Sequence, residues 1–86
     1  MVLLRMHLGR VLHKRRIEAG LTLRRLALKA NVSPGYISQL ERGRKEASSA
    51  LLNEICCALG SSLPDVLRET AASVGAEEAR SVETAA

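Results

Sequence analysis

LTLRRLALKANVSPGYISQLERG, residues 21–43, is the stretch of sequence that decides the fold. Thr22 is a good N-cap for a helix that reaches Ala30, because its side chain can accept a hydrogen bond from a free backbone N–H of the first turn. Ser33 caps a second helix that holds Pro34 in its first turn, where a missing N–H costs nothing. Between them Asn31 suits a left-handed turn residue. The stretch therefore predicts two short helices joined by a tight turn.

The apolar residues of this stretch have the spacing that lets the two helices pack. Ala27 is the small residue needed where the helices touch, and Ile37 and Leu40 point inward from the second helix. The same cluster is completed by Leu26, Ala30 and Val32. These features together predict a helix-turn-helix.

Three further helices are expected on either side of this unit. Leu4, Leu8, Val11 and Leu12 recur at helical spacing, which predicts an amphipathic helix over residues 4–19. Ser48 or Ser49 can cap a fourth helix that ends at Gly60, and Ser62 with Asp65 resembles a capping box for a fifth. Left-handed residues that end helices are expected at Gly20, Asn31, Gly43 and Gly60. The chain is predicted to be all-α.

Length and composition indicate a single domain. A chain of 86 residues holds one hydrophobic core, and Leu, Ala, Arg and Glu favour helices over strands. We expect this domain to span residues 1–70. Residues 71–86 have few large apolar side chains and are expected to form a tail, loosely ordered or helical near Ala76–Arg80, with a possible role in dimer contact.

Charge is unevenly divided along the sequence. Residues 1–45 carry eleven lysines and arginines against two acids, a net +9, whereas residues 46–86 carry two arginines against seven acids, a net −5. This division favours one face for a polyanion and another for protein or solvent. The alternative from charge alone is that the arginine-rich helices are simply solvated.

Over residues 4–69 the sequence resembles the Cro and phage-repressor class of helix-turn-helix proteins, also called the xenobiotic-response-element (XRE) class. Within that class the strings LGRVLHKRR, TLRRLA, VSPGYISQLERGRKEASS and ALLNEICCALG are similar to bacterial regulators of Clp protease genes. The resemblance implies a five-helix, lambda-repressor-like DNA-binding domain and a bacterial transcription regulator. Leu23 departs from the class, because many members have a glutamine there that touches a phosphate.

Residues that read bases are expected on the exposed edge of the second helix of the motif, opposite Ile37 and Leu40. Gln39 can pair with the N6 and N7 of adenine, and Ser38 can serve either base type. Pro34 and Gly35 allow close approach with little direct reading. Tyr36 has two interpretations: a contact to a thymine methyl or a phosphate, or a half-buried structural tyrosine.

Cationic and hydroxyl side chains at the helix ends and in the following loop are expected to contact phosphates on either side of the groove. They are Thr22, Arg24, Ser33, Arg42, Arg44 and Lys45. Each one alone could be a solvated surface group, and the prediction rests on the cluster. By the resemblance, Arg16 is expected to pair with Glu41 as part of the scaffold, since Glu41 would otherwise repel phosphate.

A homodimer that binds a pseudo-palindromic operator is expected, because one short recognition helix reads too few base pairs to find a site in a genome. The dimer surface is predicted at an apolar strip on the fifth helix, with Leu63, Val66 and Leu67. The rival function is an antitoxin-like interaction protein that uses the same fold to hold a protein partner. Against it, residues 71–86 offer only Val74 and Val82 as apolar anchors.

Other functional classes find little support in the sequence. No nucleophile, base and orienting group stand together, so we expect no enzyme, and neither a cofactor nor a small-molecule ligand is indicated. His7, His13, Cys56 and Cys57 lack zinc-finger spacing, so no metal site is expected. The cysteines are predicted to be reduced, Cys56 in the core and Cys57 exposed as a possible redox-sensitive thiol. No apolar run is long enough to cross a bilayer, which predicts a cytoplasmic protein without a membrane segment.

Overall fold

The computed structural model describes residues 2–85, with side chains through residue 82. It contains five helices: α1 (Leu4–Glu18), α2 (Leu23–Ala30), α3 (Pro34–Glu41), α4 (Ser49–Leu59) and α5 (Leu63–Ala85). No strand occurs in this part of the chain. The prediction of an all-α, five-helix domain is confirmed.

Local sequence signals set the helix ends as predicted. The side-chain oxygens of Thr22, Ser33 and Ser48 each accept a hydrogen bond from the backbone N–H three residues further on, at 3.0, 3.1 and 3.2 Å. The connections after α1, α2, α3 and α4 each use a left-handed residue with φ between 59° and 72°. These four residues are Gly20, Asn31, Gly43 and Gly60, as expected from the sequence.

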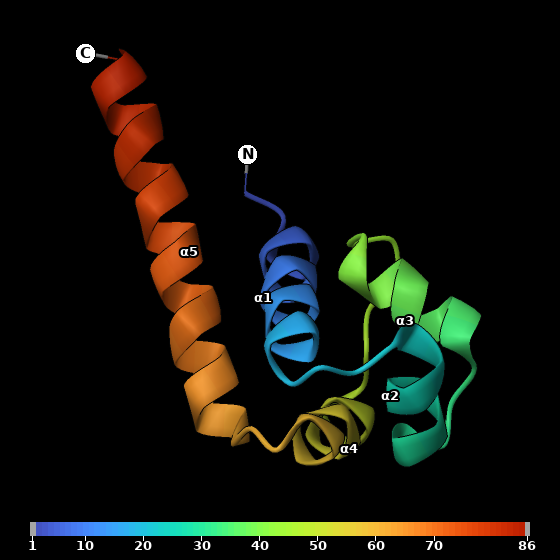
Figure 1. The fold of residues 1–86 in the computed structure, drawn as a ribbon. Helices are drawn as coiled ribbons and strands as arrows, with labels where there is room; N and C mark the ends of the chain where they lie inside the picture. Colours follow the sequence, from blue (N-terminus) through green and yellow to red (C-terminus); the bar gives the residue numbers. More distant parts are fainter. Residues whose placement is uncertain (1, 86) are drawn as a thin grey trace.

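The core forms where α1 to α4 meet and is closed on one side by α5. Helix α1 packs against both α3 and α5, and α2 packs against α3 and α4 (Figure 1). The innermost side chains include Leu12, Leu26, Ile37, Ile55 and Cys56, each at most 2% exposed. The expected apolar stripe of α1 needs one correction. Leu4 is 63% exposed, because it begins the helix beyond the edge of the core.

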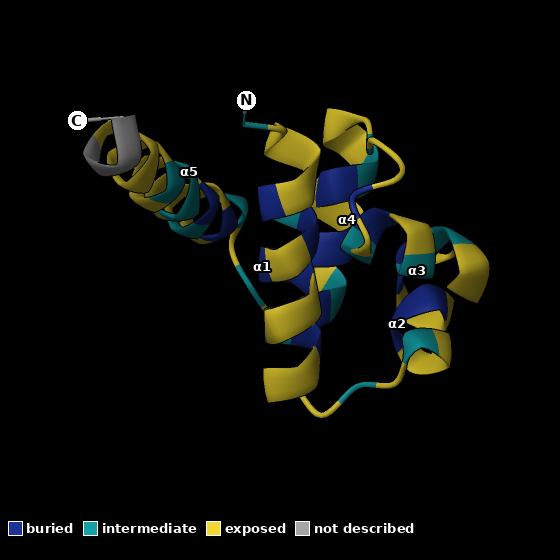
Figure 2. Cartoon of the chain, turned by 90° about the horizontal axis from the view of Figure 1, so that it is seen from above, coloured by how far each residue is buried: buried dark blue, intermediate teal, exposed yellow. Residues whose placement is uncertain are grey.

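Helix α5 continues without a break through residue 70 to Ala85. At 1.5 Å per residue its 23 residues extend roughly 34 Å, and the molecule measures 47 × 23 × 22 Å. Its first turns bury Val66 and Thr70 in the domain, whereas its later turns are largely exposed (Figure 2). Residues 71–85 are thus a helical arm extending from the domain.

Polar contacts fix α5 against α1. Glu69 accepts hydrogen bonds from Lys14 Nζ at 2.6 Å and from Arg15 Nε at 2.9 Å. The hydrogen bond from Lys14 is the main cause that lowers the pKa of Glu69, with Arg15 adding to it, and the same pairing raises the pKa of Lys14. Further along, the buried ring of His7 lies 2.7 Å from Ser73 Oγ through Nδ1. These contacts set the direction of α5.

Gly9 allows α1 and α3 to approach closely. A Cβ at this position would lie 2.7 Å from the carbonyl oxygen of Glu41 and closer still to that of Leu40. Both oxygens belong to the backbone at the end of α3 and have little freedom to move. The close crossing that brings α1 alongside the end of α3 therefore requires glycine here.

Candidate nucleic-acid interface

The unit of α2, turn and α3 holds its outer surface rigidly. Asn31 has φ 59° and ψ 45°, and the N–H of Val32 donates to the carbonyl of Ala27 at 3.0 Å, which closes the turn. Leu26 of α2 and Ile37 of α3 both belong to the buried core and are 0% and 2% exposed. The side chains on the outer surface of α3 are consequently carried by a well-packed support.

The exposed edge of α3 consists of the residues that the sequence analysis assigned to base reading. Pro34, Gly35 and Gln39 are exposed and Ser38 is half-buried, while Ile37 and Leu40 face the core. A Cβ added at Gly35 would meet no heavy atom within 4 Å, so the start of the helix is open. The edge is therefore accessible along the length of α3.

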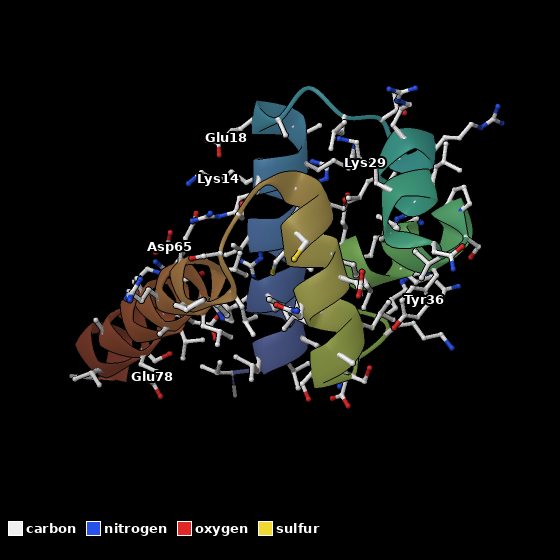
Figure 3. All side chains as sticks on the ribbon, turned by 90° about the horizontal axis from the view of Figure 1, so that it is seen from below. Lys14, Glu18, Lys29, Tyr36, Asp65 and Glu78 are labelled. Atoms are coloured by element: carbon white, nitrogen blue, oxygen red, sulfur yellow. The ribbon has the colours of Figure 1, made fainter. Side chains whose placement is uncertain are left out.

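Tyr36 has a structural contact. Its hydroxyl donates to the carbonyl oxygen of Glu46 at 3.1 Å, and its side chain is half-buried. In Figure 3, Asp65 and Glu78 mark α5, and Tyr36 lies on the opposite side of the molecule. The contact ties α3 to the loop that follows it, so the geometry favours the structural interpretation of this tyrosine over a hydroxyl bond to phosphate.

The four cations of the expected phosphate set are exposed. Arg24, Arg42, Arg44 and Lys45 are all exposed, the first on α2 and the others on the loop after α3. That loop is held from α1, because Arg5 Nε donates to the carbonyl of Gly43 at 2.8 Å.

The two hydroxyl residues of the expected phosphate set lie at the start of α2 and of α3. The oxygens of Thr22 and Ser33 accept the capping N–H bonds, and each hydroxyl hydrogen remains as a donor. The predicted phosphate-contacting residues thus lie on α2, at the starts of α2 and α3, and in the loop after α3.

Arg16 and Glu41 form a largely buried ion pair behind this edge. Arg16 Nε donates to Glu41 Oε2 at 2.7 Å and Arg16 Nη2 donates to Oε1 at 3.1 Å, with the two side chains 9% and 6% exposed. Arg16 Nη1 also donates to the carbonyl of Leu21 at 2.8 Å. One guanidinium thereby connects the end of α1, the α1–α2 connection and the end of α3.

His13 is a neighbour of this pair that the sequence did not indicate. Its Nδ1 lies 2.7 Å from Glu41 Oε1 and 3.4 Å from Arg16 Nη2. Its side chain is 54% exposed. The signal was weak, because 28 residues separate His13 from Glu41 and only the crossing of α1 over α3 brings them together.

The expected dimer strip on α5 is corrected at one position. Val66 is 0% exposed and belongs to the core of its own chain, so it cannot lie on a surface. Leu67, one position further round the helix, is 48% exposed, and Leu63 is half-buried. The error arose because the sequence does not show which face of α5 packs on α1.

The remaining chemistry-bearing residues do not form a second site of this kind. Cys56 is buried, and burial is the main cause that raises the pKa of its thiol, while Cys57 is exposed; both are free. Among residues 2–85 no three metal-ligating side chains cluster. Of the helices described, none is by itself long and apolar enough to span a membrane; α4 and α5 meet that criterion only as a pair bent by 103°.

Comparison with known proteins gives close relatives. Residues 12–66 match the helix-turn-helix family. The chain is 51% identical over 65 residues to the transcriptional regulator ClgR of Mycobacterium tuberculosis, an alignment that covers 76% of this chain and 58% of the relative. The chain thus spans less than two thirds of that relative's length.

Solved structures of regulators and controller proteins also resemble this chain. The clp gene regulator ClgR from Corynebacterium glutamicum superposes with a TM-score of 0.90 at 51% identity, covering 96% of this chain and 88% of that one. The restriction-modification controller protein C.Esp1396I superposes with a TM-score of 0.78 at 27% identity, covering 86% of this chain and 95% of that one. The lambda-repressor-like fold predicted from the sequence is confirmed. So is the expectation that the chain is not an enzyme, since these relatives are named as regulators and controllers.

Proposed function

Since this chain belongs to the helix-turn-helix family of DNA-binding transcription regulators, we propose that it binds a pseudo-palindromic operator as a homodimer and regulates transcription from it. The relatives named as clp gene regulators support Clp protease genes among its targets. Such a protein acts on DNA in the bacterial cytoplasm.

The observation that carries this proposal is the composition of the edge of α3. Gln39 and Gly35 are exposed on α3, and Arg24 on α2 and Arg44 and Lys45 in the loop after α3 are exposed as well. An α-helix fits the major groove of B-DNA, and cations on both sides of the groove neutralise phosphates and fix the register of the helix.

In the proposed complex Gln39 reads adenine through a bidentate pair and Ser38 bonds to a neighbouring base. Pro34 and Gly35 bring the start of α3 close to the base edges, and Tyr36 supports the loop and offers its ring edge. Phosphates are contacted by Thr22, Arg24, Ser33, Arg42, Arg44 and Lys45. Arg16 and Glu41 hold α3 at the angle that this docking requires.

A second copy is proposed to bind at α5 and the apolar hollow beside it. The hollow has a volume of about 450 Å³ and is lined mainly by leucines of α1, α3, α4 and α5, among them Leu8, Leu52 and Leu67. Exposed apolar surface of this kind is characteristic of protein contacts. The residues proposed at the interface are Leu63 and Leu67, with the exposed Leu4 at the rim.

A two-fold dimer must present both α3 helices to one face of the duplex, which places half-sites about 10 to 10.5 base pairs apart. Selection of bound sites from random duplex DNA tests this. The proposal expects an inverted repeat with that spacing. Recovery of no enriched site, together with copurification of a second small protein, would favour the antitoxin-like function instead.

Self-association has its own test. Analytical ultracentrifugation should show a dimer for the wild type and a monomer for Leu67→Asp, because the new carboxylate would be buried without a partner in the interface. Ala72→Asp on the exposed surface of α5 is the matched control and should remain dimeric. A monomeric wild type would contradict the homodimer.

A further inference from the structure

A small notch lies between α1 and α3 beside the Arg16–Glu41 pair. It has a volume of about 190 Å³, and its lining comes from three helices. The lining residues are His13, Arg16, Leu23, Ser38, Glu41 and Arg42. Ser38 and Arg42 belong to the proposed DNA surface, so the notch opens beside that surface.

We propose that this notch binds one backbone phosphate of duplex DNA and that His13, in its protonated form, is a donor to it. DNA binding then takes up a proton at each notch. This inference rests on the proposed function, because it assigns one more contact to the same complex. It adds a residue of α1 that the sequence motif does not include.

The hydrogen bonds of His13 leave one ring nitrogen for the phosphate. Nδ1 lies 2.7 Å from Glu41 Oε1, so Nδ1–H donates to that carboxylate and Nε2 is the remaining nitrogen. In neutral imidazole with its proton on Nδ1, Nε2 is an acceptor and repels a phosphate oxygen; after protonation it becomes a donor. At 54% exposure the side chain is accessible to DNA.

The charges around His13 leave room for an anion. The charged groups that face His13 are Glu41 on α3, Arg42 at the end of α3 and Arg16 on α1, whose Nη2 lies 3.4 Å from Nδ1. Leu23, from α2, carries no charge. Two arginines against one carboxylate leave a net positive notch. A phosphate placed there adds negative charge and favours protonation of the ring.

Leu23, which lines the notch from α2, cannot donate a hydrogen bond to a phosphate. His13 lines the same notch as Leu23 and supplies a polar group there.

Fluorescence anisotropy with a duplex operator, between about pH 6 and pH 8, tests the proposal, because histidine changes its charge in this range. The variants are His13→Gln, which cannot be charged, and His13→Arg, which always is. The wild type should bind more weakly as pH rises. At pH 6 His13→Gln should bind roughly tenfold more weakly than the wild type. His13→Gln should bind independently of pH, and His13→Arg should bind tightly across the range.

Three controls make the result specific. Thermal melts should show that both variants remain folded, since His13 is on the surface of α1 and Glu41 keeps its bonds to Arg16. His7 is present in every variant, so the comparison between variants isolates the effect of the residue at position 13. A scan of single methylphosphonate substitutions should find one phosphate per half-site whose neutralisation removes the pH dependence of the wild type and leaves His13→Gln unaffected.

A wild-type affinity independent of pH, or a His13→Gln variant with the full pH dependence, would overturn the inference while leaving DNA binding intact. Absence of wild-type binding to any duplex would overturn the proposed function, and this inference with it.

Discussion

Replacing Glu41 by glutamine should destabilise the fold strongly, although the shape of the side chain is kept. Glu41 accepts two hydrogen bonds from Arg16 and lies 2.7 Å from His13 Nδ1. The substitution removes the charge and leaves the guanidinium, 9% exposed, without a counter-charge. A buried ion pair that loses one partner costs about 3 to 5 kcal/mol. Arg16 keeps its bond to Leu21, so we expect about 3 kcal/mol.

Urea denaturation followed by circular dichroism measures this effect. With a slope of about 1 to 1.5 kcal/mol per molar urea, a decrease of about 3 kcal/mol lowers the midpoint by roughly 2 to 3 M. Arg16→Met should cost a similar amount. The double variant should be more stable than the sum of the two single effects predicts, because the second substitution removes a group already without its partner.

The pair formed by Asp65 and Arg68 on α5 is the matched control. Its Oδ1–Nη1 distance is 2.6 Å, as short as that of the buried pair, but its side chains are 58% and 74% exposed. A double-mutant cycle with Asp65→Asn and Arg68→Gln should give a coupling below about 1 kcal/mol. A coupling between Arg16 and Glu41 no larger than this would refute the scaffold role of the pair.

Three further outcomes are expected. Gly9→Ala should lower the free energy of unfolding measured by urea denaturation by about 1 to 3 kcal/mol, because its Cβ would meet backbone oxygens of α3. The control Gly75→Ala, whose Cβ would have nothing within 4 Å, should be neutral or stabilising. Equal destabilisation by the two variants would contradict the close crossing of α1 and α3. Gln39→Ala should reduce the discrimination between bases at one base pair by about 1 to 3 kcal/mol and leave the melting temperature nearly unchanged. Ile37→Ala should instead lower the free energy of unfolding by about 2 to 5 kcal/mol. A large drop in the melting temperature of Gln39→Ala would mean that the faces of α3 are assigned wrongly. Glu69 has a folded-state pKa below its ordinary value of 4.5, so its stabilising contribution is present above that pH and disappears as pH falls below it. Below that pH, the stability of Glu69→Gln should therefore decrease less steeply in an acid titration than that of the wild type. Identical curves would contradict the pairing of Glu69 with Lys14 and Arg15.

The sequence was sufficient for the parts of the fold that depend on local chemistry. Thr22, Ser33 and Ser48 cap their helices because a side-chain oxygen three residues before a free N–H is a local arrangement. Asn31 takes the left-handed conformation for a similar reason, since its own backbone preference suffices. The exposed edge of α3 followed from the helical period once Ile37 and Leu40 were assigned to the core.

What the sequence did not show depends on how helices distant in the chain pack. Val66 was assigned to a dimer surface but is buried within its own chain, and His7 is buried although it is polar, since Ser73 on α5 meets its ring. Gly9 carries no signal in the helical pattern, and its role is defined by the end of α3. Likewise, nothing in the sequence indicated that His13 contacts Glu41, and His13 was considered only as a metal ligand and excluded. Each of these roles requires the packing of helices that lie far apart in the sequence.

The central claim is that the basic surface around α3 binds duplex DNA through its phosphates, and the salt dependence of binding tests it most directly. With about six to ten phosphate contacts per dimer, a plot of log affinity against log salt should be linear with a slope of about −0.9 per contact. Arg44→Ala should weaken binding to all sequences alike and make this slope less steep by about 1 for each phosphate that the variant no longer neutralises. An affinity that does not change with salt would contradict the claim.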